Sequence, residues 1–405
     1  MIGRLLPLAV LLAGCQAACS GPRLHSPVPL WELEERVLAD SNDAAAHYAV
    51  ALGYWARGRW ERAEAALREA VALDSKLAPG YLALAYLPYA RRPQLWEEAL
   101  EGRVPAAWQE AVEASDRFFR RAFMVDPFVD LRIAGAARPP GPAWWDTDEE
   151  LQRSRDDWNS SLDDLLAGRY EAAYEKLGRL RAAFERRGVS DRQPAGQGEP
   201  GAAGRVPAAI LWHHAMVAAR IRRFDEASAG LSLLLARSPD AEAQDEIMRL
   251  PLRPNDYRYL LAAVKQRAGD VREAVQLYRE ALQEDLGLYM AHVQLASIHE
   301  RRGRWSAAIE ERRRAVESNP GDAALVYDLG TTLYRAGREA DAEEALREAI
   351  ALNPRDYRPY YVLGLATAEQ GKHEAAREAF DRFLELAPGR MTAADNTARH
   401  RRIVP

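Results

Sequence analysis

A period of 34 residues constrains the fold of this chain more than any other feature. Glycines mark it at Gly269, Gly303, Gly337 and Gly371. Five residues after each glycine stands an alanine, at Ala274, Ala308, Ala342 and Ala376. A unit of this length holds two helices joined by a turn, and one such pair cannot bury its apolar face without neighbours. The period therefore predicts contiguous helix pairs over residues 255–288, 289–322, 323–356 and 357–390.

Further positions of the period carry residue types that packed helices need. A second small residue follows seven positions later at Ala281, Ala315 and Ala349, and prolines close the last three units at Pro320, Pro354 and Pro388. At these positions the sequence resembles the tetratricopeptide-repeat (TPR) family. The resemblance implies a right-handed superhelix of antiparallel helix pairs with a concave inner face.

The same pattern continues upstream in a looser form. Residues 44–77 fit one unit, 154–187 fit another in part, and 208–241 fit a third, although Arg222 stands where a glycine is usual. A further unit is split, with a first helix at 80–87 and a second at 106–127. We therefore expect an all-α TPR solenoid of about eight units, interrupted by insertions.

Glycine and proline divide this solenoid into regions. An N-terminal TPR-like region at 31–187 holds insertions at 88–105 and 128–150, and a third interruption covers 242–254. A linker rich in glycine and proline at 188–207 precedes the C-terminal TPR array at 208–390, and a basic tail follows at 391–405.

Composition narrows the class of function. A net charge of −5 in 405 residues argues against a general nucleic-acid binder, which needs a basic face to displace counterions from phosphates. Both cysteines, Cys15 and Cys19, lie near the N-terminus. The remaining chain therefore has no disulfide, thiolate nucleophile or cysteine-ligated metal.

The first residues read as a leader. Residues 1–14 carry one positive charge, Arg4, before a short apolar run that ends in Leu12-Ala13-Gly14-Cys15. This LAGC resembles the bacterial lipobox, which implies cleavage after Gly14 and lipid on Cys15, with residues 15–30 as a flexible stalk. In lipoproteins with this motif, an aspartate directly after the cysteine usually marks retention in the inner membrane. Because Gln16 stands there instead, we expect the protein to be held on the outer membrane, facing the periplasm. The alternative is an ordinary signal peptide cut near Cys19.

The sequence contains no recognisable catalytic set. No HExxH, phosphate-binding glycine loop or nucleophile elbow is present, and His213-His214 point about 100° apart on a helix, which is poor geometry for one metal. The run Glu311–Arg314 is interpreted as an exposed helix face. We expect no enzyme activity, no cofactor and no metal. The alternative is an enzyme or ligand-binding module in the insertions of 88–150, where Trp144-Trp145 lie.

The TPR resemblance also implies where a partner binds, because first-helix positions two, five, nine, twelve and thirteen line the concave face in that family. Aromatic residues and arginines dominate binding hot spots. The predicted partner-binding residues are Trp212, Met216, Arg220, Tyr259, Gln266, Arg267, Tyr327, Tyr334, Arg335, Arg358 and Tyr361. The alternative is that the tyrosines pack between helices. We expect a lipid-anchored envelope scaffold that binds a protein or peptide segment in this groove.

Overall fold

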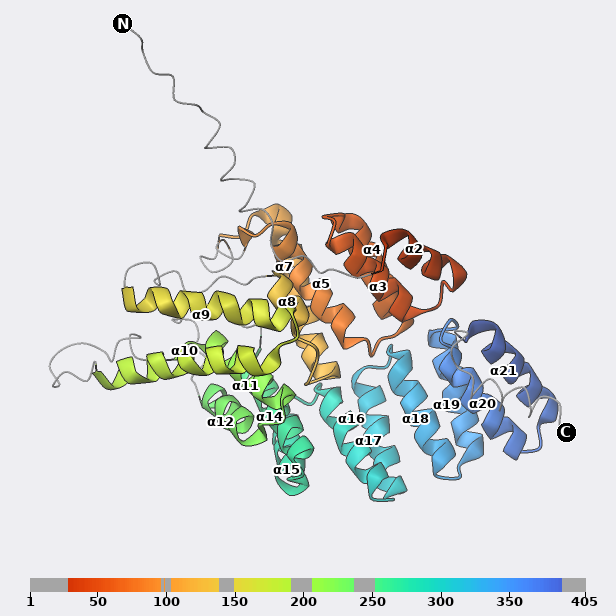
Figure 1. Ribbon diagram of the computed structural model, residues 1–405. Helices are drawn as coiled ribbons and strands as arrows, with labels where there is room; N and C mark the ends of the chain where they lie inside the picture. The colour runs from red at the N-terminus through yellow and green to blue at the C-terminus, as the bar shows by residue number, and fades with distance from the viewer. Residues whose placement is uncertain are drawn as a thin grey trace, which may run out of the picture.

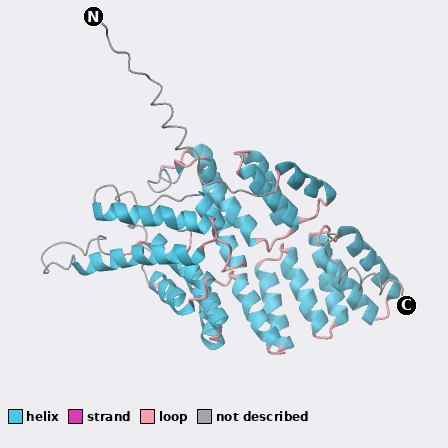
Figure 2. Ribbon diagram, in the orientation of Figure 1, coloured by secondary structure: helices cyan, strands magenta, loops and turns pink. Residues whose placement is uncertain are grey.

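The computed structural model describes residues 28–95, 98, 103–137, 149–190, 206–236 and 252–387. The predicted leader, Cys15, Trp144-Trp145 and the tail from 391 lie outside these residues, as do most of the stalk and of the linker. Every element in the described part is a helix (Figure 2).

The N-terminal half contains α2 (Leu30–Ala39), α3 (Ala44–Trp55), α4 (Trp60–Leu73), α5 (Ala78–Arg91), α7 (Ala106–Val125), α8 (Arg132–Ala137), α9 (Glu149–Leu166) and α10 (Tyr170–Ser190). The C-terminal half contains α11 (Ala208–Arg220), α12 (Phe224–Leu235), α14 (Pro254–Ala268), α15 (Val271–Glu284), α16 (Tyr289–Arg301), α17 (Trp305–Ser318), α18 (Ala323–Arg335), α19 (Glu339–Leu352), α20 (Tyr357–Glu369) and α21 (His373–Leu386).

These helices form consecutive pairs that stack into a solenoid (Figure 1). The units, numbered 1 to 8, are the pairs α3/α4, α5/α7, α9/α10, α11/α12, α14/α15, α16/α17, α18/α19 and α20/α21. The predicted all-α solenoid is confirmed.

Small residues allow the two helices of a pair to approach closely. Ala274 and Ala281 are fully buried. At Gly364 of α20, a Cβ atom would lie 2.5 Å from the ring of Phe380 in α21. A side chain at this position would therefore separate the two helices, which is why the period requires a small residue there.

Three boundaries differ from the expected ones. Helix α5 continues through Pro88 to Arg91, although the first insertion was expected to begin at 88. Tyr89 is buried beyond the proline, so packing offsets the backbone hydrogen bond that proline cannot make. Helix α9 begins at Glu149, inside the expected second insertion, and α10 extends to Ser190, inside the expected linker.

Helix α2 was not predicted as a separate element. Its Leu30 and Leu33 form a small apolar cluster with Val50 of α3. The helix therefore covers the apolar face that unit 1 would otherwise expose at the end of the solenoid, as terminal repeats require.

An aromatic cluster around α11 joins the two halves of the chain. The ring of Trp212 lies 4.9 Å from Phe123 of α7, and the ring of His213 lies 5.1 Å from Trp158 of α9. His213 is fully buried, and its Nδ1 lies 2.8 Å from the carbonyl oxygen of Ala209. Core packing, and not ligand binding, explains this histidine.

Arg222 occupies a backbone conformation that favours glycine. Its φ is 67°, like that of the turn glycine Gly337 at 71°, whereas every other non-glycine residue with described geometry has a negative φ. A side chain in this left-handed region costs about 1–2 kcal/mol. Because Arg222 is exposed, removing its side chain loses no core contact.

We expect Arg222→Gly to raise the free energy of unfolding by about 1 kcal/mol, measured as a shift in the urea midpoint at constant slope. The comparison is Arg223→Gly, because φ at the adjacent Arg223 is −85° and glycine there relieves no strain, adds unfolded-state entropy and loses the Arg223 contacts with Glu226 and the Tyr174 ring, so it should lower stability. Equal effects of the two substitutions, or a loss of stability in Arg222→Gly, would contradict this interpretation.

Burial of His213 and His214 makes the fold sensitive to acid. Burial lowers the pKa of each from 6.5 to about 4, so between these values the unfolded chain binds more protons than the folded chain. Stability therefore falls as pH drops from 6.5 towards 4, by on the order of 3 kcal/mol for each histidine.

We expect His213→Gln to flatten the pH dependence of the urea midpoint between pH 7 and pH 4.5, even if the variant is less stable at neutral pH. The exposed His373, at the start of α21, provides the control substitution His373→Gln, which should leave the wild-type slope unchanged. A wild-type slope in His213→Gln would show that this histidine does not contribute.

Candidate partner-binding face

The first two units and the last four units face each other. We name helices α2 to α7, residues 28–125, the N-terminal arm. We name helices α14 to α21, residues 254–386, the C-terminal array; they form the last part of the TPR array predicted at 208–390. Figure 1 shows α2 to α4 beside α19 to α21, although they stand at opposite ends of the sequence. Hydrogen bonds and ion pairs join the arm to the array, and the arm covers part of the predicted groove.

At unit 8 the arm presents acidic groups and carbonyls to two arginines. Arg355 lies 2.5 Å from Glu69 and 3.0 Å from the carbonyl oxygen of Ser41. Arg358 donates to both carboxylate oxygens of Asp356 and lies 3.3 Å from Asp74. Although burial alone would lower the pKa of Arg358, the hydrogen bonds and charges of these aspartates raise it above its ordinary value.

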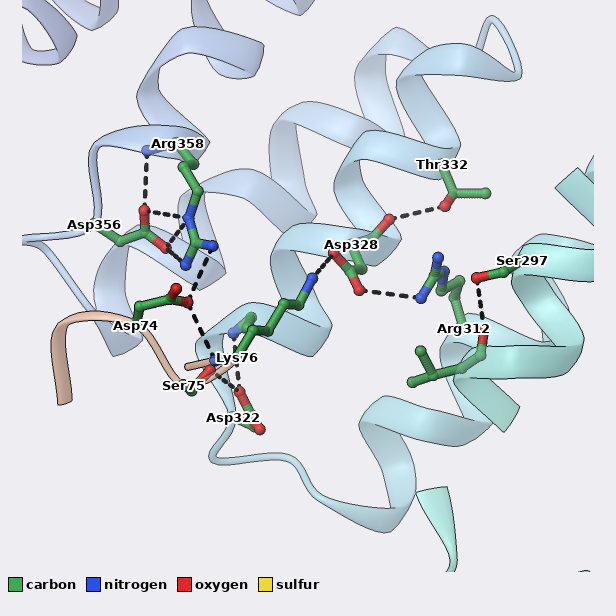
Figure 3. Close-up of polar contacts among 12 residues, drawn as sticks. Asp74, Ser75, Lys76, Ser297, Arg312, Asp322, Asp328, Thr332, Asp356 and Arg358 are labelled. Carbon is green, nitrogen blue, oxygen red and sulfur yellow. Dashed lines mark hydrogen bonds and ion pairs between the residues drawn. The ribbon is translucent and has the colours of Figure 1, made fainter. Parts of the chain in front are cut away.

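At unit 7 the signs are reversed, and the arm presents cations to aspartates. Lys76 lies 2.5 Å from Asp328 (Figure 3). Arg121 lies 2.6 Å from Asp322. The hydroxyl of Ser75 donates to the same Asp322 at 3.1 Å. The loop 74–76 between α4 and α5 therefore touches both units 7 and 8.

At unit 5 the contact is buried. Arg120 of α7 lies 2.8 Å from Asp256, whose side chain is fully buried, and 3.5 Å from Asp285. The hydroxyl of Tyr259 donates to the carbonyl oxygen of Met124 at 2.8 Å. Burial alone would lower the pKa of Arg120, but its hydrogen bond to Asp256 raises it.

Two cavities remain between the arm and the array. One, of about 490 Å³, includes Ser75, Tyr81 and Arg358 in its lining, and the other, of about 310 Å³, includes Lys76 and Gln294. Arg121 and Asp322 belong to both linings. The arm therefore contacts the inner face of the array through ion pairs and hydrogen bonds and does not fill the space beside that face.

One arginine of the run Glu311–Arg314 is buried, and the expectation of an exposed face is wrong at that position. Arg312 is 7% exposed and lies 3.0 Å from both Glu300 and Asp328. Thr332 donates to Glu300 at 2.8 Å. Arg312 thus orders the aspartate that receives Lys76 of the arm.

Three predicted groove residues are buried within the protein. Trp212, Met216 and Tyr259 are 0%, 3% and 0% exposed, respectively. The prediction that they line an open groove is wrong, because α7 packs against them: Trp212 contacts Phe119 and Phe123, and Tyr259 bonds to the backbone of α7.

Three further residues are half-buried, and two of them meet the arm. Tyr327 has the ammonium of Lys76 6.0 Å and the guanidinium of Arg358 5.6 Å from its ring centre. Tyr361 instead packs on Phe383 of α21, with ring centres 5.2 Å apart, as the alternative of packing between helices predicted.

The remaining predicted residues lie at the C-terminal ends of first helices, away from the arm contacts. Tyr334 donates to Glu369 at 2.6 Å, and Gln266 accepts from Tyr278 at 2.9 Å. The exposed arginines are Arg220, Arg267 and Arg335. Arg220 donates to the carbonyl oxygen of Phe128 at 2.9 Å.

Each of these three arginines lies on an aromatic ring, and that of Arg220 is Tyr170, whose centre is 5.3 Å from the guanidinium. The guanidinium of Arg267 is 4.2 Å from the ring centre of Phe128, and that of Arg335 is 5.1 Å from Trp305. Stacking of this kind holds one face of the guanidinium and leaves its N–H edge able to pair with a carboxylate, as Arg335 does with Glu300 at 3.6 Å. Arg301 is exposed at the equivalent position of unit 6.

We name Arg267, Arg301 and Arg335 the arginine ladder. Its members are 34 residues apart in sequence and occupy the same place in three consecutive units. Arg301 is not among the predicted partner-binding residues, although it occupies position thirteen of its unit, as Arg267 and Arg335 do. The 34-residue spacing of the arginine ladder was visible in the sequence, whereas the exposure of its side chains depends on where the arm lies.

The described residues show no group of histidine, cysteine and acidic side chains able to hold a metal ion. Among the described helices, none is long and apolar enough to cross a membrane.

Comparisons with known proteins agree with the repeat. Residues 259–323 and 327–390 match the family described as tetratricopeptide repeat. No curated protein matches the sequence. Solved structures titled "MamA RS-1 ArsTM double mutant" and "Crystal structure of MamA" are 20% and 21% identical to this chain, with TM-scores of 0.36 and 0.35. They cover 44% and 45% of this chain and 94% and 96% of their own. Residues 259–323 and 327–390 of the C-terminal array are thus TPR repeats.

Proposed function

We propose that this protein is a TPR scaffold of the bacterial cell envelope, held by lipid on Cys15, that binds a segment of a protein partner through the open part of its inner face. The observation that carries the binding function is the arginine ladder beside Tyr334. TPR repeats support an interaction role, and we propose no reaction and no cofactor.

The lipid anchor rests on the LAGC sequence that ends at Cys15, after a charge and a short apolar run. The residues between the anchor and α2 include Pro22, Pro27 and Pro29, which disfavour a helix and suit a stalk. Two or more acyl chains on one cysteine hold a protein stably on a bilayer, which one chain does not. The periplasmic face of the outer membrane is the proposed location.

We expect Cys15→Ser to abolish incorporation of radiolabelled palmitate and to move the protein from the membrane fraction to the soluble fraction in cells. Cys19→Ser is the matched control and should leave both unchanged, because only Cys15 follows the LAG sequence. Palmitate incorporation into Cys15→Ser, or its loss in Cys19→Ser, would contradict lipid on Cys15, and a wild-type protein that incorporates no palmitate would favour the ordinary signal-peptide alternative.

The chemistry of the open strip favours an acidic partner segment. Three arginine side chains at equivalent positions of stacked units present N–H groups along one edge, and an extended chain with carboxylates spaced along it would pair with them. Tyr334 adds an aromatic surface beside the last of them. The overall charge of the protein is negative, so this edge is a local exception that favours such a segment.

The chain provides its own control for this proposal. Arg279, Arg313 and Arg347 form a second exposed series, also 34 residues apart, but on the second helices α15, α17 and α19. Charge reversal of either series changes the net charge by the same amount, so a difference between the two reports position and not total charge.

We expect the triple substitution Arg267→Glu, Arg301→Glu and Arg335→Glu to remove most photo-crosslinking to a partner in cells, from a benzoylphenylalanine placed at Gln266. Loss of hot-spot contacts costs about 1–3 kcal/mol each. The control Arg279→Glu, Arg313→Glu and Arg347→Glu should retain the crosslink. Equal crosslinking in both triple variants, at equal helical circular dichroism, would exclude the ladder as the binding edge.

A further inference from the structure

We propose that the N-terminal arm is a latch held on the C-terminal array by complementary charges, and that its outer end, at units 7 and 8, opens while its inner end, at unit 5, stays closed. Opening exposes the covered half of the inner face, including Tyr327 and Arg358. The consequence for partner access rests on the proposed binding function, whereas the opening itself does not.

The charges on the two sides of this contact are segregated and complementary. The arm presents Glu69 and Asp74 to the arginines of unit 8. Next to them it presents Lys76 and Arg121 to the aspartates of unit 7. Because both signs occur on each side in a matching order, a shifted placement of the arm would bring like charges together. This arrangement gives the closed position a defined register.

Apolar packing does not hold the outer end. The apolar clusters of units 7 and 8 draw their residues from the stretch between Ile309 and Ala387, and none of the described arm residues belongs to them. The cluster that includes the arm continues through Tyr259 and ends at Ile298 in unit 6. The contact beyond unit 6 is therefore polar, and the cavities beside it leave it accessible to water and ions.

The two ends of the contact also differ in exposure. At unit 8 the side chains of the pair Arg355–Glu69 are 46% and 37% exposed, whereas those of Arg121–Asp322 at unit 7 are 19% and 8% exposed and Asp256 at the inner end is 0% exposed. Salt screens exposed pairs far more than buried ones, since the screening length falls from about 10 Å at 0.1 M to about 3 Å at 1 M. Salt should therefore release the outer end first.

The test is a distance distribution between spin labels on Ala65→Cys in α4 and Glu378→Cys in α21, both exposed positions, in the full chain carrying Cys15→Ser and Cys19→Ser. We expect one narrow distribution at low salt and a broader, longer one at 1 M salt. Arg355→Glu with Arg358→Glu should open the latch at low salt, and adding Glu69→Arg and Asp74→Arg should close it again.

A control variant makes the outcome decisive. Arg347→Glu with Arg382→Glu makes the same change in charge on the neighbouring helices α19 and α21, at arginines that pair with a glutamate of their own helix, and should stay closed. An unchanged distribution in Arg355→Glu with Arg358→Glu, or an equal opening in the control, would overturn the proposal.

Access to the covered face is measured separately, by the rate at which a maleimide modifies Ser297→Cys, a residue that lines the smaller cavity, in the same background without spin labels. We expect roughly a tenfold faster reaction in the open variant, which corresponds to about 1.4 kcal/mol in the free energy of opening. An unchanged rate would overturn the gating role. Neither readout uses a partner, so failure of the proposed binding function would leave both results intact.

Discussion

The structure depends on the stacking of helix pairs that cannot be stable alone. Each pair has an apolar face wider than it can bury within itself, so the next pair must cover it. Small residues set how closely the pairs approach: at Gly364 a single added carbon would meet the ring of Phe380. Because each unit repeats the same crossing, the chain advances by a similar rotation each time, and its curvature follows from a local contact repeated many times.

That curvature has a long-range consequence. After several units and the insertions between them, the first units return to the inner face of the last ones, and Lys76 reaches Asp328 across 252 positions of sequence. The returning arm covers one side of the inner face and leaves the other side exposed. First-helix positions near the N-terminal ends, such as Tyr259 and Arg358, meet the arm, whereas positions near the C-terminal ends, such as Arg335, remain exposed. A solenoid of this length thus uses part of its own groove to close itself.

The two kinds of contact that close it have different physical properties. Around α11 the halves share an apolar, aromatic core in which Trp212 and His213 are fully buried, and such packing is insensitive to salt. At units 7 and 8 the contact consists of ion pairs, from the partly buried Arg121–Asp322 to the exposed Arg355–Glu69, and exposed pairs contribute little net stability. The contact around α11 is therefore fixed, and the contact at units 7 and 8 is weakly held. This difference is the physical basis of the proposed latch.

The sequence by itself determined the helix pairs, their turns and their number, because these follow from residue types at fixed local spacings: small residues at crossings, and glycine where φ is positive. Even the departure at Arg222 keeps the glycine-like φ of 67°. Only the tertiary structure decided which side of each first helix remains open. Trp212 and Arg335 both occupy groove positions of the repeat, yet one is 0% exposed and the other is exposed. The difference arises because the placement of α7 and of loop 74–76 depends on rotation accumulated over many units, and no local pattern encodes that sum.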